Sequence, residues 1–288
     1  MKDNYLSRRI FIGFNYTFLV LFSLFVFLPF WSTFLVSLTR EQNLRLGFSL
    51  FPKEIYLGSY RLLFKEGNII RAFFNSLKVT GMGIAMTLFF TMTFAYTVTR
   101  KDLYGLNQIY IFMLIPGYFS GGMIPMYLLI RNLRMLNTYW ALTVPSSVSF
   151  YYILLTRNYF RTIPFDLIES ARIDGAKEMR IIFSIMMPLA APIIAAVTLF
   201  SGVSFWNQYF TAVLYINDFR KMTYQVILRE MLAEMQIDVM QIGETGKQEI
   251  GESLKMAATY LGFLPVLIAY PFAQKYFTKG IIVGSIKG

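Results

Sequence analysis

The sequence has no cysteine and no histidine in its 288 residues. These absences exclude disulfide bonds, thiol nucleophiles, metal sites built from these residues and histidine acid–base catalysis. Charged residues are also scarce, at 15% of the chain, whereas a soluble domain has roughly 25%. We therefore expect a membrane protein with no catalytic residue and no metal site.

Long apolar runs dominate instead, since 56% of the residues are hydrophobic and 18% are aromatic. A transmembrane helix needs about 20 mostly apolar residues. Six stretches approach or exceed this length, namely residues 10–38, 72–98, 109–130, 139–155, 185–216 and 256–277. The predicted fold is all-α, a polytopic membrane protein with six transmembrane helices.

The polar segments between the apolar runs define a predicted topology. An even number of spans places both termini on one face, together with the turn at 99–108 and the segment at 156–184. Arg8 and Arg9 precede the first span, and with the basic turn they favour the cytosol for this face. The expected parts are a cytosolic segment at 1–11, a transmembrane domain at 12–277 with external loops at 39–71 and 217–255, and a cytosolic tail at 278–288.

The net charge of +11 raises the question of an anionic partner. The basic residues are scattered through loops between apolar runs and form no single basic face. This distribution is typical of contact with anionic lipid headgroups and with a cytosolic protein, and it does not indicate nucleic-acid binding.

A compact charged segment, residues 163–188, interrupts the apolar sequence. Asp166 and Glu169 are spaced like a capping box at a helix start. Gly175 is expected to end this helix, because glycine readily adopts positive φ. A second amphipathic run then leads to Pro188 and the fifth span. The pattern predicts a helix, a glycine joint and a second helix, which either dock into a groove on a partner or lie on the membrane surface.

The charged segment also resembles the cytoplasmic signature of permease subunits of ABC importers. That signature reads Glu-Ala-Ala, three residues, Gly, nine residues, Ile, one residue and Leu-Pro. Every spacing matches, and Ser170 and Met187 alone differ from the signature, which falls here on Glu169-Ser170-Ala171, Gly175, Ile185 and Met187-Pro188. Further stretches resemble the carbohydrate branch, which includes the maltose-type permeases, and within it the complex-oligosaccharide group related to LplC-type permeases; they are residues 73–80, 120–142, 205–216, 252–259 and 270–288.

The resemblance implies the fold of a type I ABC importer permease for carbohydrate, specifically for an oligosaccharide. The charged segment would be its coupling helix, which rests in a cleft of a cytosolic ATPase and passes nucleotide-driven closure to the spans. The positions carried over to ATPase coupling are Glu169, Ser170, Ala171, Asp174, Gly175, Ile185 and Pro188.

The resemblance also implies partners and a location. The chain would lie in the bacterial cytoplasmic (inner) membrane with a second, related permease subunit. An extracytoplasmic solute-binding protein would deliver the carbohydrate and contact the 217–255 loop, for which a plain connector is the alternative.

The chain itself contains no ATP-binding motif. A P-loop reads G-x-x-x-x-G-K-[ST], and the nearest stretch, at 243–248, has Gln241 in place of the first glycine and Gln248 in place of Ser or Thr. We therefore expect no cofactor here, with ATP and Mg²⁺ bound by a separate ATPase dimer. A secondary carrier or a channel without an ATPase is the alternative, although the span interiors lack the acids or histidines of proton-coupled carriers.

Candidate substrate contacts lie in the fifth and third spans. The run SFWNQYF at 204–210 offers aromatic faces together with neutral donors and acceptors, the mixture that a sugar requires. The aromatic belt of a membrane interface is the alternative explanation. The candidate path residues are Trp206, Asn207, Gln208 and Tyr209 in the fifth span, with Tyr118 and Ser120 in the third.

Overall fold

The computed structural model describes residues 3–44, 54–100, 104–119, 121–241 and 251–285. Every regular element in these ranges is a helix, and none of the described residues forms a strand. This confirms the predicted all-α fold. The chain divides into two compact units, residues 1–69 with 228–263 and residues 70–227 with 264–288. All the expected site residues that the structure describes belong to the second unit.

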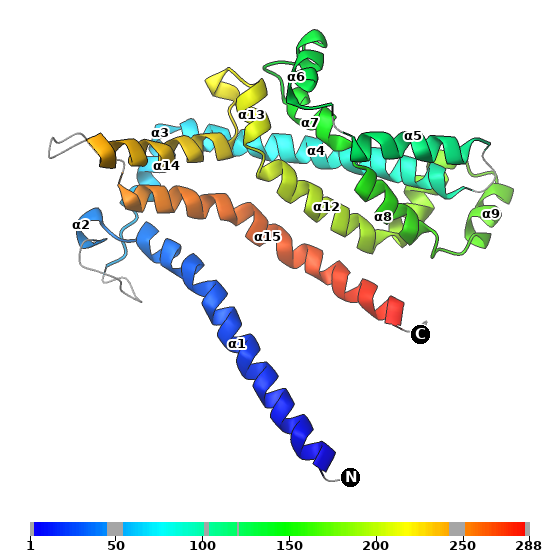
Figure 1. Cartoon of the computed structure of the whole chain (residues 1–288), viewed down its shortest axis with the longest axis horizontal. Coiled ribbons are helices and arrows are strands. Elements are labelled where there is room, and N and C mark those ends of the chain that lie inside the picture. The colour runs from blue at the N-terminus through cyan, green and yellow to red at the C-terminus, as the bar shows by residue number, and fades with distance from the viewer. Residues whose placement is uncertain (1–2, 45–53, 101–103, 120, 242–250, 286–288) are drawn as a thin grey trace. The chain divides into compact units, whose positions relative to one another are not determined.

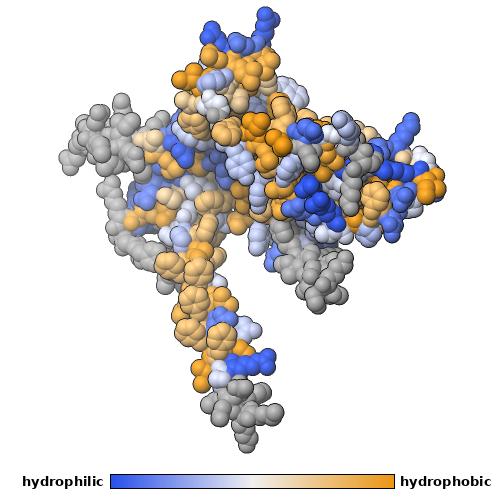
Figure 2. Space-filling model, turned by 45° about the vertical axis from the view of Figure 1, so that its right-hand side comes forward, coloured by the Kyte–Doolittle hydropathy of each residue, from blue (hydrophilic) through white to orange (hydrophobic). Residues whose placement is uncertain are grey.

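The first unit joins the predicted first span to the start of the sixth. Hydroxyl groups hold its helices together, since Ser59 Oγ lies 2.8 Å from Ser253 Oγ and Ser37 Oγ lies 2.8 Å from the Tyr60 hydroxyl. Much of α1 exposes apolar side chains, as Figure 2 shows, which suits a helix surrounded by lipid or by other membrane helices. The helices of this unit are α1 (Asp3–Ser37), α2 (Glu41–Leu44), α3 (Gly58–Glu66), the later part of α14 (Tyr224–Gln241) and the first part of α15 (Glu252–Ser285).

The second unit contains most of the predicted transmembrane region. Helix α8 packs against α5 and α12, while α7 packs against α13 (Figure 1). Besides the later part of α15, its elements are α4 (Asn68–Thr99), α5 (Leu106–Tyr118), α6 (Met123–Asn132), α7 (Tyr139–Ser147), α8 (Phe150–Phe160), α9 (Asp166–Ile173), α10 (Glu178–Arg180), the π-helix η1 (Ile181–Met186), α11 (Met187–Leu189), α12 (Ala191–Trp206), α13 (Phe210–Tyr215), the 3-10 helix η2 (Phe219–Lys221) and the start of α14 (Tyr224–Gln241).

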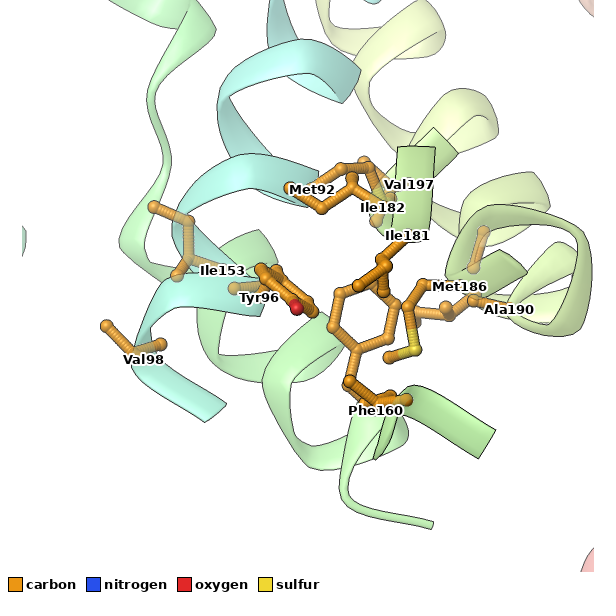
Figure 3. Packing of buried hydrophobic residues seen from close by; sticks show 14 of the residues in the cluster. Met92, Tyr96, Val98, Ile153, Phe160, Ile181, Ile182, Met186, Ala190 and Val197 are labelled. Atoms are coloured by element: carbon orange, nitrogen blue, oxygen red, sulfur yellow. The ribbon is translucent and has the colours of Figure 1, made fainter. Parts of the chain in front are cut away.

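Among the described residues of this unit, two hydrophobic clusters form a core, and α4 contributes to both. The first packs Met92 and Tyr96 of α4 against α8, α9, η1 and α12, and it includes the fully buried Ile181 and Met186. Figure 3 shows these side chains pointing toward one another. The second packs Val79 of α4 against α6, α7, α13 and the start of α14. Positions 79 and 92 are about 20 Å apart along an α-helix, so the two clusters lie at different levels of α4.

Three of the six predicted spans are divided into shorter helices. The third consists of α5 and α6, which are bent by 111°, and in the fifth the helical run ending at Leu189 is bent by 89° from α12. The fourth is divided between α7 and α8 at Val148 and Ser149, whose backbone is extended. Residues that disrupt helices lie at or near these breaks, among them Gly122 and Pro145. By length and apolar composition, three of the described helices can cross a membrane, or up to five if each bent pair is one span.

Residues 217–255 differ from the predicted loop, because η2 and α14 occupy much of this stretch. Residues 242–250 lie outside the described ranges. The start of the stretch meets the short connection between α6 and α7, where the Asn137 side-chain oxygen accepts hydrogen bonds from the N–H groups of Asn217 and Asp218. Two connections assigned to the same outer face therefore lie together.

Candidate functional site

Helix α9 forms the first half of the charged segment. Its N-cap is Phe165, which makes no side-chain cap hydrogen bond, so the predicted capping box of Asp166 and Glu169 does not form. The helix begins one residue earlier than that box requires, and Asp166 is its first residue, where a negative charge favours the helix dipole. Ser170 Oγ donates a hydrogen bond to the Asp166 carbonyl at 2.7 Å. The acidic first turn is therefore stabilised by the dipole and by a local bond instead of a capping box.

Gly175 lies just after α9 in a left-handed backbone conformation, with φ at +77°. Its N–H donates to the Arg172 carbonyl at 2.9 Å, and the N–H of Ala176 donates to the Ala171 carbonyl at 2.9 Å. These two bonds form a Schellman motif, in which glycine is favoured at the left-handed position. A Cβ atom at Gly175 would meet nothing within 4 Å. The glycine is therefore required by the backbone conformation and not by packing.

The second half of the segment is helical but irregular. Helices α10, η1 and α11 follow one another from Glu178 to Leu189, with π-helical hydrogen bonding over Ile181–Met186. Of the expected coupling residues here, Ile185 is partly buried against the first hydrophobic cluster and Pro188 is exposed. A π-helical turn is rare and occurs frequently at functional sites. The irregular helix and the bend that follows it set this segment apart from a continuous transmembrane helix.

The charged segment has an inner face and an outer face. Ile168 and Ala171 are buried in the first hydrophobic cluster, so Ala171, an expected coupling residue, packs against the core. Leu167, Ile173 and Met179 are exposed, and Ile173 is 82% exposed. The exposed side therefore carries unpartnered apolar side chains beside polar ones. Besides Pro188, the expected coupling residues that are exposed are Glu169, Ser170, Asp174 and Gly175.

Four polar side chains that sequence spacing does not connect meet beside this segment. We call Tyr96, Arg100, Arg172 and Glu178 the Glu178 cluster. Glu178 accepts a hydrogen bond from the Tyr96 hydroxyl and forms ion pairs with Arg100 at 2.9 Å and with Arg172 at 3.2 Å. Partial burial by itself raises the pKa of Glu178, but the Tyr96 hydrogen bond and the two arginine charges outweigh it and lower the pKa below its ordinary value. The carboxylate is therefore charged at neutral pH.

The expected path residues lie at and around the break between α12 and α13. Trp206 is 3% exposed and stacks on Tyr224, with 5.9 Å between ring centroids. Asn207 is exposed and accepts a hydrogen bond from Gln225 at 3.3 Å, while the Gln208 side chain donates to a carbonyl of α7 at 3.2 Å. The remaining candidates are Tyr209, which is partly buried, Tyr118, which is exposed in α5, and Ser120, which lies outside the described residues. Asn207 is thus the candidate at this break that is exposed to a solute, whereas Trp206 is part of the core.

A cavity of about 680 Å³ lies within the second unit, between α4, α12 and the later part of α15. Its lining is mainly apolar, with the small residues Ala191, Ala195 and Gly202 along α12. Pro188 of the charged segment and Trp206 at the end of α12 both line it. The same cavity is therefore lined by a residue of the segment expected to bind the ATPase and by a residue expected at the substrate path.

Comparison with known proteins gives concordant matches. Residues 96–283 match the family model of binding-protein-dependent transport system inner membrane components. The chain is similar to the polygalacturonan/rhamnogalacturonan transport system permease protein YtcP of Bacillus subtilis, with 37% identity over 98% of this chain and 100% of that protein. It is 35% identical to Protein LplC of the same organism, over 98% of this chain and 96% of that protein.

A solved structure is similar over nearly the same length. It is a chain from the crystal structure of a bacterial ABC transporter involved in the import of the acidic polysaccharide alginate. The TM-score is 0.83 and the identity is 27%, with 94% of this chain and 98% of that chain covered. The likeness therefore extends far beyond the charged segment.

Proposed function

Because the chain belongs to the family of binding-protein-dependent transport system inner membrane components, we propose that it imports an oligosaccharide as one permease subunit of an ATP-driven transporter. It is a non-catalytic subunit, and the energy comes from a separate ATPase. The relatives named for polygalacturonan/rhamnogalacturonan and for alginate support a carbohydrate substrate. The neutral side chains at Asn207 and Gln208 suit hydroxyl groups of a sugar.

The outer face of the charged segment is the observation that carries this proposal. Leu167 and Ile173 are exposed apolar residues that a partner would cover. Glu169 on α9 and Asp174 at its C-cap are exposed acids. The exposed charged residues between Asp166 and Asp174 are all acids, and the exposed bases of the segment, Lys177 and Arg180, follow Gly175. Acidic side chains are repelled by anionic lipid headgroups, so α9 suits a protein cleft better than the membrane surface. We assign the cleft to the ATPase, and we assign the segment and both chain termini to the cytosol.

Three partners complete the proposed transporter. A second permease subunit forms the other half of the pathway, and an ATPase dimer binds ATP and Mg²⁺ on the cytosolic side. A solute-binding protein delivers the oligosaccharide on the outer side, where the connection between α6 and α7 meets the start of the 217–255 stretch. The family description itself, binding-protein-dependent transport, supports the solute-binding protein.

Uptake into vesicles tests the transport class. The assembled transporter is reconstituted with the ATPase dimer, with an ATPase variant that cannot hydrolyse ATP, or without the ATPase, and labelled oligosaccharides of both neutral and acidic type are offered with the solute-binding protein. We expect uptake to require hydrolysis-competent ATPase. Equal uptake in all three preparations would establish the alternative, a secondary carrier or channel.

A charge reversal tests the docking face. Glu169→Lys places a cation on the exposed side of α9, and we expect less ATPase to copurify with the permease pair. Glu230→Lys is the matched control, because Glu230 is an exposed acid on α14, at a distance from the charged segment in the sequence. If both variants retain wild-type amounts of ATPase, the assigned docking face is wrong.

A further inference from the structure

Glu178 is the point at which three stretches of the chain meet. Tyr96 lies in the last turn of α4 and Arg100 follows that helix. Arg172 lies in the last turn of α9, and Glu178 begins α10. All three partners direct polar hydrogens at one carboxylate. The single side chain of Glu178 therefore bonds to α9 and to the end of α4 at the same time.

The ion pair between Arg172 and Glu178 spans the glycine joint. Arg172 precedes Gly175 by three residues and Glu178 follows it by three. Backbone hydrogen bonds already set the local turn, but they do not fix the direction of the helix beyond it. The 3.2 Å pair connects the helical parts on the two sides of the joint, so α9 and α10 are held as one piece.

The end of α4 is anchored from a second direction as well. Arg157 of α8 donates from Nε to the Val98 carbonyl at 3.1 Å. Its guanidinium also lies 5.2 Å from the ring centroid of Tyr110 in α5, within the range of a cation–π contact. Helices α5 and α8 are thereby joined to the same end of α4 that holds Glu178.

Helix α4 extends from this anchored end to the cavity in the second unit. Leu77, Thr80 and Ile84 of α4 line that cavity opposite residues of α12. Closer to the anchored end, Met92 and Tyr96 pack in the first hydrophobic cluster (Figure 3). A displacement of the anchored end would therefore reach the wall of the cavity through a packed helix, since closely packed side chains transmit strain.

We propose that Glu178 is the positioning residue that makes the charged segment move as one body with α4, so that closure of the ATPase is transmitted to the cavity wall. This inference rests on the proposed function, because it requires an ATPase on the outer face of the segment. It adds a residue outside the signature positions to the coupling machinery. Arg172 and Arg100 hold Glu178, and Tyr96 connects it to the core.

If Glu178 only stabilised the fold, loss of its charge would lower the thermal unfolding midpoint as much as it weakens coupling. The side chains of the ion pairs remain partly exposed, at 45% for Glu178, 22% for Arg100 and 28% for Arg172. Ion pairs in contact with water contribute little to folding stability. Loss of the Glu178 charge should therefore change coupling much more than it changes the thermal unfolding midpoint.

The test uses the assembled transporter, consisting of the permease pair, the ATPase dimer and the solute-binding protein in vesicles. Glu178→Gln keeps the size of the side chain and removes its charge. The control is Asp166→Asn, the same type of exchange at an exposed acid of the same segment that lies outside the Glu178 cluster. Arg100→Lys preserves the charge of one partner, whereas Arg100→Gln removes it. Three quantities are measured: the amount of copurified ATPase, the thermal midpoint, and ATP hydrolysis with and without the binding protein.

We expect Glu178→Gln to lower binding-protein-stimulated hydrolysis about tenfold, with the wild-type amount of ATPase still attached. Arg100→Gln should act in the same direction, and Arg100→Lys should restore most of the stimulation. Tyr96→Phe, which keeps the ring in the core and removes the hydroxyl, should also weaken stimulation, and it provides a second variant if Glu178→Gln does not assemble.

Two results would overturn the inference. One is stimulation of Glu178→Gln within about twofold of wild type, and the other is an equal loss in Asp166→Asn. Either result, obtained while the wild-type chain binds and stimulates its ATPase, leaves the proposed function intact. If the wild-type chain neither binds nor stimulates the ATPase, the proposed function fails and this inference fails with it.

Discussion

Replacing Gly175 by alanine is expected to weaken coupling through backbone strain alone. The residue has φ at +77°, a region that costs a residue with a Cβ atom about 1–2 kcal/mol. The added methyl group meets no atom within 4 Å, so no steric clash adds to this cost. The alanine variant can relieve the strain by opening the Schellman turn, which would change the direction of α10 relative to α9.

Proline at the same position should have a larger effect. It fixes φ near −65°, far from the observed value, and it removes the N–H that donates to Arg172. Loss of that hydrogen bond adds about 1 kcal/mol to the backbone strain. The expected order of binding-protein-stimulated ATP hydrolysis is wild type, then Gly175→Ala, then Gly175→Pro.

Gly81→Ala is the matched control for these variants. Gly81 lies inside α4, and a Cβ atom there also meets nothing within 4 Å. Because its backbone is helical, alanine should leave stability unchanged or raise it by about 0.5–1 kcal/mol. The assays are the thermal midpoint of the purified permease pair and stimulated ATP hydrolysis in vesicles. If Gly175→Ala is as active as Gly81→Ala, the reasoning from backbone conformation is refuted.

Other sites give predictions of different kinds. Gly83→Ala places a Cβ atom 2.5 Å from the Phe205 ring, and we expect a destabilisation of about 1–3 kcal/mol, seen as a lower thermal midpoint; an unchanged midpoint would show that the ring moves freely. Trp206→Ala removes a buried ring and should lower the free energy of unfolding by about 3–5 kcal/mol. Asn207→Ala, in contrast, should keep the thermal midpoint and raise the half-saturating substrate concentration for uptake. Unchanged uptake would show that Asn207 does not line the path. The lowered pKa of Glu178 means that its contribution to stability is complete above the ordinary carboxyl pKa and is lost as pH falls through the lowered value. The midpoint difference between wild type and Glu178→Gln, which is expected to be small because the ion pairs contact water, should therefore be constant from about pH 8 to pH 5.5. A difference that disappears already near pH 6 would contradict the assigned environment.

The charged segment was largely predictable from the sequence because its signals are local. A glycine at a helix end and a proline near the next span have the same meaning in most chains. The predicted capping box was wrong for an equally local reason, since the helix begins one residue earlier than the spacing suggested and Phe165, not Asp166, is the N-cap. A shift of one residue at a helix end is within the accuracy of sequence reasoning.

The divided spans could not be predicted from apolar composition. Residues 109–130 are hydrophobic throughout most of their length, yet the chain bends by 111° between α5 and α6. Hydropathy predicts that a segment lies in the membrane, but it does not predict the direction of the helix axis. The bend depends on the backbone around Gly122, with φ at +87°, and a glycine in an apolar run is equally compatible with a straight helix.

The other features that the sequence could not predict depend on contacts between residues that are distant in the chain. The path prediction for Trp206 came from the chemistry of its side chain, which suits a sugar, and could not include its ring contacts with Tyr224 and Phe73. The role of Glu178 depends on Tyr96 and Arg100, about 80 residues earlier in the chain. No single-sequence pattern encodes such a pairing, so it became visible only in three dimensions.

Site-directed crosslinking tests the central claim most directly. The chain has no cysteine, so Ser170→Cys introduces a unique thiol on the exposed side of α9. In the assembled transporter, with a single cysteine in the cleft of the ATPase, we expect a crosslink whose yield changes when ATP is added. Glu230→Cys, on α14, should form no such crosslink. Absence of a crosslink at position 170 in a complex that hydrolyses ATP normally, or equal yields at both positions, would contradict the assignment of this segment to the ATPase.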